Sequence, residues 1–173
     1  MKKLFFILTL LPFLSFTQNH FKALEQKDNI SAIIIDEQML KVMSNMEVNS
    51  NDKESKEYSN LLKSIKNVNV YIDNSGMHQK EMLNLFKSYS NKYNLKEKKI
   101  PDNKILCYIK SGSSSDKIKQ LLLFTENLNK QTKTIIVVIK GDFKMEQAEM
   151  LIQKMKIPGV KQFSNFQKKS NQK

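Results

Sequence analysis

Tryptophan and arginine are both absent from this sequence, although it has 173 residues and 29 of them are basic. Arginine supplies the planar group that grips phosphates and guanine edges through paired hydrogen bonds, so its absence argues against specific recognition of those groups. A chain without tryptophan is also a poor candidate for a sugar-binding cleft, which usually needs aromatic platforms. We therefore expect no nucleic-acid partner, and we do not favour a glycosidase.

Cysteine, histidine and glycine are scarce, with one, two and four residues respectively. Cys107 lies inside the apolar run ILCYI, which predicts a packing role and leaves no partner for a disulfide. The histidines have no ligand spacing, so we expect no metal. The glycines are too far apart for a phosphate-binding loop, so we expect no cofactor; they are Gly76, Gly112, Gly141 and Gly159.

Residues for nucleophilic catalysis are present, but not in a catalytic pattern. The chain has no Gly-x-Ser-x-Gly elbow, and the segment SGSSSD at 111–116 is typical of a turn. We expect His20 to lie in an unstructured N-terminal segment and His78 to be exposed in the first turn of a helix. We therefore predict no catalytic, cofactor-binding or metal-binding residue, and we rank an unrecognised hydrolase as the third alternative.

The N-terminal stretch MKKLFFILTLLPFLSFTQ has the order of a secretory signal peptide: lysines, a short apolar run, then small residues. The run is too short to span a bilayer as a helix, which takes about 20 apolar residues. We expect cleavage near Thr17 and a mature chain without a transmembrane segment. The expected divisions are a signal peptide at 1–17, one domain at 18–160 and a lysine-rich flexible tail at 161–173.

The formal net charge is +12. A basic exported protein could bind anionic envelope polymers or lipid headgroups. The sequence is also rich in lysine, asparagine and isoleucine, which AT-rich codons specify, so base composition is an alternative explanation of the charge. The sequence leaves this question open.

In the first half of the chain, Ser31–Ile35 predicts a strand, and Met39, Val42, Met43 and Met46 then recur at helical spacing. We interpret this methionine face as a core stripe rather than a copper site, since no histidine or cysteine is near. The expected elements that follow are a loop at Asn49–Glu57, a helix through Tyr58, Leu61, Leu62 and Ile65, an alternating strand at Val68–Ile72 and a turn at Asp73–Gly76.

The second half predicts a long helix from His78 to Tyr93 and a strand at Ile105–Ile109. Lys117–Asn127 is ambiguous, because its apolar spacing fits a helix capped by Asp116, yet the run LLLFT fits a strand. The remaining expected elements are a strand at Ile135–Ile139 and a helix through Met145, Ala148, Ile152 and Met155 that ends near Pro158-Gly159.

Gly141-Asp142 joins the last strand to the last helix, where many α/β enzymes hold a phosphate or a catalytic acid. With so few glycines nearby, we interpret it as a corner. We expect Gly141 to supply conformational freedom and Asp142 to cap the helix.

Several segments taken together resemble the bacterial family called domain of unknown function 4252. They are the exported start, the early strand and methionine-rich helix, CYIKSGSSSDKIKQLLLF, and TIIVVIKGDFKMEQAEMLIQKM. The resemblance covers roughly Phe21 to Gly159 and implies a small exported envelope protein with a strand at 117–125. It supplies no catalytic residues. Members are often lipid-modified, whereas this chain has no N-terminal cysteine.

We therefore predict an α+β fold, with a mixed, largely antiparallel sheet packed against amphipathic helices. The expected function is a noncatalytic binding or structural module of the cell envelope, periplasmic or associated with the outer membrane. Its expected partner is an unknown envelope protein or an anionic envelope polymer. A lysine-rich module that binds anionic polymers or lipids is the alternative.

Overall fold

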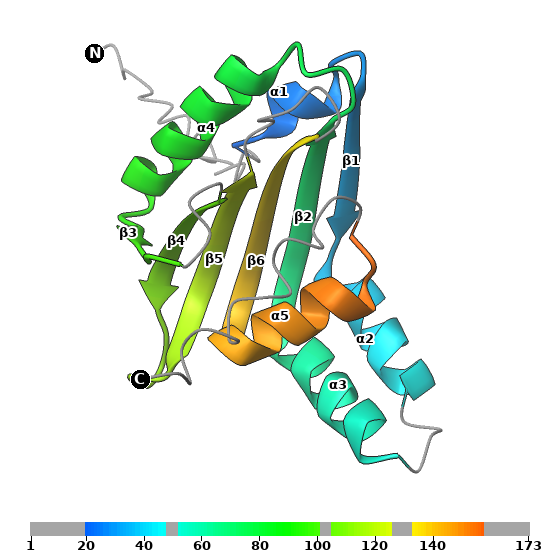
Figure 1. Cartoon of the computed structure of the whole chain (residues 1–173). Helices are drawn as coiled ribbons and strands as arrows, with labels where there is room; N and C mark the ends of the chain where they lie inside the picture. The colour runs from blue at the N-terminus through cyan, green and yellow to red at the C-terminus, as the bar shows by residue number, and fades with distance from the viewer. Residues whose placement is uncertain (1–19, 48–51, 101–104, 126–132, 158–173) are drawn as a thin grey trace, which may run out of the picture.

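One antiparallel sheet of six strands forms the centre of the described structure (Figure 1). The structure is a computed structural model that describes residues 20–47, 52–100, 105–125 and 133–157. Neighbouring strands follow the order β1-β2-β6-β5-β4-β3. Their bounds are β1 Ile30–Ile35, β2 Ile65–Asp73, β3 Lys96–Glu97, β4 Ile105–Ser111, β5 Lys117–Thr125 and β6 Thr134–Lys144.

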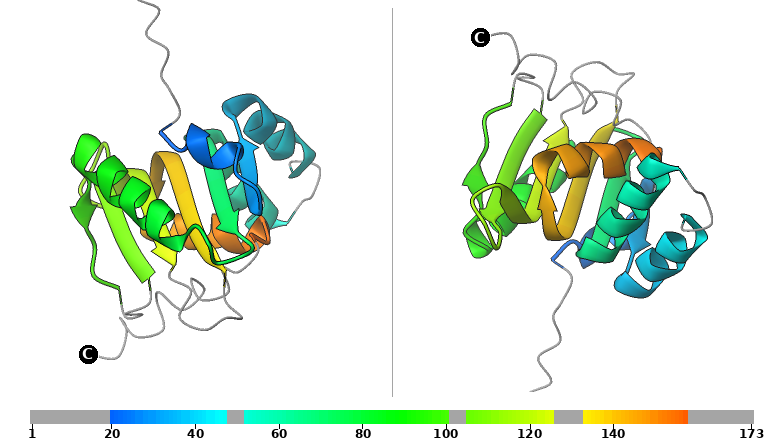
Figure 2. Two further views of the ribbon diagram at one scale, coloured as in Figure 1. Left: turned by 90° about the horizontal axis from the view of Figure 1, so that it is seen from above. Right: turned by 90° about the horizontal axis from the view of Figure 1, so that it is seen from below.

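Helices cover both faces of this sheet, and each face has its own core (Figure 2). The helices are α1 Lys22–Glu25, α2 Glu37–Glu47, α3 Lys53–Ser64, α4 Gln79–Lys92 and α5 Met145–Lys154. On one face, α1 and α4 pack aromatic side chains such as Phe86 against Tyr71 and Phe124 of the sheet. On the other face, α2, α3 and α5 cover the alternate residues of the same strands, such as Val70 and Ile139.

The ambiguous segment at 117–125 is strand β5, the form that the family resemblance favoured. It pairs with β4 on one side and β6 on the other, both antiparallel. Leu121 and Leu123 point into the core under α5, whereas Leu122 and Phe124 point into the core under α4. Because both faces are covered there, the run Leu121–Phe124 is continuously apolar, and that run produced the accidental helical spacing.

Two boundaries around α3 differ from those expected. Asp52 caps the helix by accepting the Ser55 N–H at 3.2 Å, so α3 begins at Lys53, inside the loop expected at Asn49–Glu57. The helix ends at Ser64, and Ile65, expected on its apolar face, is the first residue of β2. Asp52 is a strong N-cap residue, a signal that the apolar periodicity alone did not include.

The α+β class is confirmed, with a single open sheet whose five strand pairings are all antiparallel within the described ranges. The expected sheet was mixed and largely antiparallel, so the observed pairing is simpler. The predicted signal peptide at 1–17, the tail at 161–173 and the helix end near Pro158-Gly159 lie outside the described residues. No helix in the described part of the chain is long and apolar enough to cross a bilayer.

Candidate functional site

Asp142 belongs to the sheet and does not cap the last helix, so the predicted capping role is wrong. It lies inside β6, and α5 begins three residues later, where Gln147 Oε1 accepts the Lys144 N–H at 2.8 Å. Asp142 instead accepts hydrogen bonds from Ser113 Oγ at 2.8 Å and Lys117 Nζ at 3.0 Å. The Lys117 ammonium and the Ser113 hydroxyl lower the Asp142 pKa to about 2. Asp142 therefore holds the turn between β4 and β5.

Gly141 is required by close packing rather than by an unusual backbone angle. Gly76 is the only described glycine with a positive φ, so the conformational freedom expected of Gly141 is not used. A Cβ at Gly141 would lie 2.5 Å from the Ser64 carbonyl oxygen and 2.8 Å from the Ile65 Cα. The end of α3 thus packs directly on the β6 backbone, and the corner is structural.

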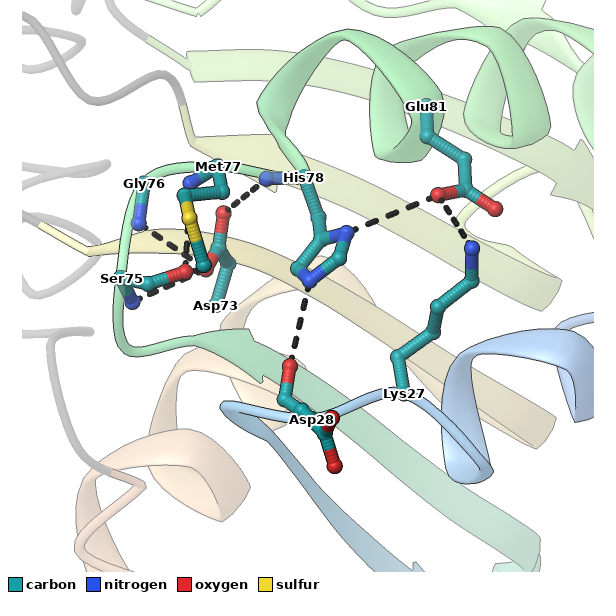
Figure 3. A network of polar contacts seen from close by, with 8 residues as sticks. All are labelled: Lys27, Asp28, Asp73, Ser75, Gly76, Met77, His78 and Glu81. Atoms are coloured by element: carbon teal, nitrogen blue, oxygen red, sulfur yellow. Dashed lines mark hydrogen bonds and ion pairs between the residues drawn. The ribbon is translucent and has the colours of Figure 1, made fainter.

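The turn after β2 is organised by one buried carboxylate, that of Asp73 (Figure 3). Its Oδ1 accepts the Ser75 N–H at 2.9 Å, the Ser75 hydroxyl at 2.8 Å and the Gly76 N–H at 2.9 Å. Its Oδ2 accepts the His78 N–H at 2.8 Å. Burial alone would raise the Asp73 pKa, but these hydrogen bonds outweigh it and hold the pKa below its ordinary value.

His78 is not the freely exposed side chain expected, because it bridges the start of α4 to the segment before β1. Its Nε2 lies 3.1 Å from the Asp28 carbonyl oxygen, and its Nδ1 lies 3.6 Å from Glu81 Oε2 (Figure 3). Lys27 Nζ binds the same Glu81 oxygen at 3.1 Å. Ser75 donates its hydroxyl to Asp73 and not to His78. The cluster therefore contains a serine, a histidine and carboxylates without the hydrogen bond that would activate the serine.

The second histidine also has packed surroundings, contrary to expectation. The His20 ring lies edge-on to Phe21 and to Tyr89, with ring centroids 5.4 and 5.3 Å apart. Burial and the nearby Lys92 lower the His20 pKa. The Tyr89 hydroxyl accepts a hydrogen bond from the Gln120 amide on the sheet. The described neighbours of His20 thus include two aromatic rings and a lysine, and they include no acidic partner that would favour the charged imidazole.

The described residues give little support to three other kinds of site: a metal site, a binding site in a surface depression and a reactive thiol. No three His, Cys, Asp or Glu side chains there are close enough to hold a metal ion. An open depression of about 540 Å³ between α3 and α5 is lined by residues that include Glu54, Glu149 and Lys154. Lys154 Nζ already binds Glu54 Oε1 at 2.7 Å across it. Cys107 is buried in the core, as expected, and burial raises its thiol pKa to about 12.

The most unusual surface is the apolar border of the sheet at β1. All the large hydrophobic side chains exposed in the described residues lie on β1, on α2 after it, or in the turn that contacts the start of β1. They are Ile33, Ile34, Met39, Val42, Met46 and Met77. We call this set the β1 border. Ile33 and Ile34 are successive residues of one strand and point to opposite faces, so the β1 border lies around the sheet edge rather than on one face. Exposed apolar side chains gathered in one region are typical of interaction sites.

The methionine face of α2 was predicted to be a core stripe, and that prediction is wrong for most of its members. Leu40 is fully buried and Met43 packs partly against the core. Met39 and Met46 are 51% and 72% exposed. The helix has two neighbouring apolar stripes, and the one containing Leu40 faces α3 and the sheet. Sequence reasoning missed the β1 border because it assigned every apolar helix position to one core.

The geometry defines a class of protein: an α+β protein with one open antiparallel sheet, helices on both faces and an apolar border at β1. The chain matches the family described as domain of unknown function (DUF4252) over residues 21–151. It therefore belongs to that family, and the resemblance noted from the sequence is confirmed. No curated protein and no solved structure matches the chain.

Proposed function

We propose that the protein is an exported, noncatalytic binding module of the cell envelope. The observation that carries this proposal is the β1 border, where six large apolar side chains are between 37% and 72% exposed. Leaving such surface in water is unfavourable by about 25 cal/mol per Å². Apolar surface of this kind is expected where a protein binds another macromolecule.

The polar clusters support a noncatalytic role. The Ser113 hydroxyl donates to Asp142, and the Ser75 hydroxyl donates to Asp73. Both carboxyl groups have lowered pKa values, so they are weak bases for accepting a serine proton. The Cys107 thiol is buried with a raised pKa, which disfavours the reactive thiolate. These two carboxylates, Asp73 and Asp142, hold turns in place through the hydrogen bonds they accept.

Export can be tested separately from binding. Mass spectrometry of the protein from its host should find an N-terminus near Gln18, and fractionation should place it outside the cytoplasm. An intact Met1 on a cytoplasmic protein would refute the envelope assignment. The apolar border would then need a cytoplasmic partner.

Binding is tested with two variants that add the same charge at different places. Val42→Lys places a lysine on the exposed face of α2, and Asn84→Lys places one on the exposed side of α4. The immobilised wild-type and Asn84→Lys proteins should retain the same partner from envelope extracts, and Val42→Lys should lose most of it. Equal retention by all three would refute the role of the border.

A further inference from the structure

We propose that the partner at the β1 border is a second copy of this chain, paired antiparallel through β1 about a two-fold axis at Ala32. This inference deepens the proposed function by naming the occupant of the border. Its first basis is the backbone of β1, which forms one edge of the sheet (Figure 1). Its second basis is the placement of the exposed apolar side chains along that edge.

The hydrogen-bonding direction of β1 follows from one contact at its start. The Asn74 N–H donates to the Asn29 carbonyl oxygen at 2.9 Å, and these two residues continue the β1–β2 register in which Ser31 pairs with Ile72. In an antiparallel pair, bonded and non-bonded residues alternate. Residues 31, 33 and 35 therefore bond to β2. The N–H and C=O groups of Ala32 and Ile34 point away from the sheet. At Ile30 the C=O has the same direction, whereas the N–H donates to the Lys27 carbonyl oxygen at 3.3 Å.

A two-fold axis perpendicular to the sheet at Ala32 fits this pattern. It places Ala32 opposite the partner's Ala32, so that their N–H and C=O groups face each other. It also places Ile30 opposite the partner's Ile34, so that the Ile34 N–H faces the Ile30 carbonyl oxygen. An axis at Ile33 would instead place Ile30 opposite Asp36, which lies beyond the end of β1. Pairing at Ala32 thus joins two sheets into one and keeps the antiparallel order that every other pairing follows.

The same axis brings the exposed apolar groups together. The Asn74 amide donates to Ser31 Oγ at 2.9 Å, which places the turn carrying Met77 at the start of β1, while α2 continues from its end. Antiparallel pairing exchanges the two ends, so α2 of each copy lies at the end where the other copy carries Met77. Each copy therefore offers six large apolar side chains, 37% to 72% exposed, around the edge that the pairing joins.

Charge does not oppose this pairing, despite the net charge of +12. The strand ISAIII carries no charge, and its flanking charged residues include two lysines and three acids: Lys27, Asp28, Asp36, Glu37 and Lys41. The other edge of the sheet is different. It ends in the two-residue strand β3, Lys96–Glu97, and short charged edges resist further pairing. The assembly therefore closes at two copies.

Sedimentation equilibrium on the purified chain, in the form its host accumulates, tests the proposal. Between 1 and 200 µM, roughly the range of weak specific dimers, the wild type should move from monomer to dimer. Ala32→Pro removes the central outward N–H without breaking a bond to β2, and should weaken dimerisation at least tenfold. Ala32→Val, which keeps the N–H, should stay within about threefold of the wild type. A wild-type monomer throughout, or equal dimerisation by Ala32→Pro, would overturn the proposal.

A second pair of variants keeps the test decisive if Ala32→Pro does not fold. Ala32→Cys should give a covalent dimer on mild oxidation, because Cα atoms of opposed bonded residues lie about 5.5 Å apart, within disulfide range. Asn84→Cys is the matched control, and the native Cys107 is buried. Equal cross-linking of both variants would refute pairing at Ala32. A monomer that still retains an envelope partner through Val42 would refute the second copy and leave the proposed function standing.

Discussion

Replacing Asp73 by alanine should remove about 3 kcal/mol from the free energy of unfolding, because one buried side chain organises the whole β2–α4 turn. Its carboxylate accepts three backbone N–H groups, those of Ser75, Gly76 and His78, at 2.8 to 2.9 Å. A buried N–H left without a partner costs about 1 to 3 kcal/mol. We expect about 1 kcal/mol for each of the three, because water can reach part of an exposed turn.

The Asp73→Asn variant removes the negative charge but keeps the size and shape of the side chain. The amide oxygen can still accept from Ser75 and Gly76, but the amide nitrogen then faces the His78 N–H, so the expected loss is about half as large. Asp28→Asn is the control, because that side chain is exposed and the His78 contact uses the backbone carbonyl. It should change stability by less than about 0.5 kcal/mol.

The assay is urea unfolding followed by circular dichroism, repeated between pH 7 and pH 3. Because the folded Asp73 pKa lies below its ordinary value of 3.8, its stabilisation is complete above that value and is lost as the pH falls through the folded pKa. The Asp73→Asn variant should therefore lose less stability in acid than the wild type. The reasoning would be refuted if Asp73→Ala lowered the free energy of unfolding by less than about 1 kcal/mol and left the loss of stability between pH 7 and pH 3 equal to that of the wild type.

Three further predictions concern the corner and the core. Gly141→Ala should cost about 2 kcal/mol in urea unfolding, because the new Cβ would press on the Ser64 carbonyl; an unchanged stability would contradict that packing. Asp142→Ala should speed amide exchange in the Ser111–Asp116 turn and leave α5 unchanged, whereas a helix cap would give the reverse. Cys107 should react with a thiol reagent at pH 8 only as fast as the protein unfolds, because the thiol is buried and its pKa is raised to about 12. Rapid labelling of the folded protein would contradict this burial.

The sequence was informative where local pattern and tertiary burial agree. The alternation of Val68, Val70 and Ile72 correctly predicted a strand, since those residues fill one core while their neighbours turn to the other face. The helix over Met82, Phe86 and Tyr89 was also correct, because its apolar positions meet one face of the sheet. Turn chemistry at Asp73–Gly76 was correctly located, although the number of bonds that Asp73 accepts was not predictable.

The remaining differences arise where a residue's partner is distant in the chain. Asp142 resembled a helix cap because a helix follows. Its side-chain partners Ser113 and Lys117 lie 29 and 25 residues earlier in the chain. Gly141 is small because α3 packs on it, a contact that no local pattern encodes. On α2, Met39 and Leu40 are equally apolar, so periodicity could not decide which one faces the core.

Amide hydrogen exchange along β1 tests the central claim most directly. In the proposed pair, the N–H groups of Ala32 and Ile34 are bonded between copies, whereas those of Ser31 and Ile33 are bonded to β2 in both monomer and dimer. Concentrating the protein from 1 to 200 µM, roughly the span of weak dimerisation, should slow exchange at Ala32 and Ile34 and leave Ser31 and Ile33 unchanged. Exchange at Ala32 and Ile34 that stays fast at every concentration would contradict the account.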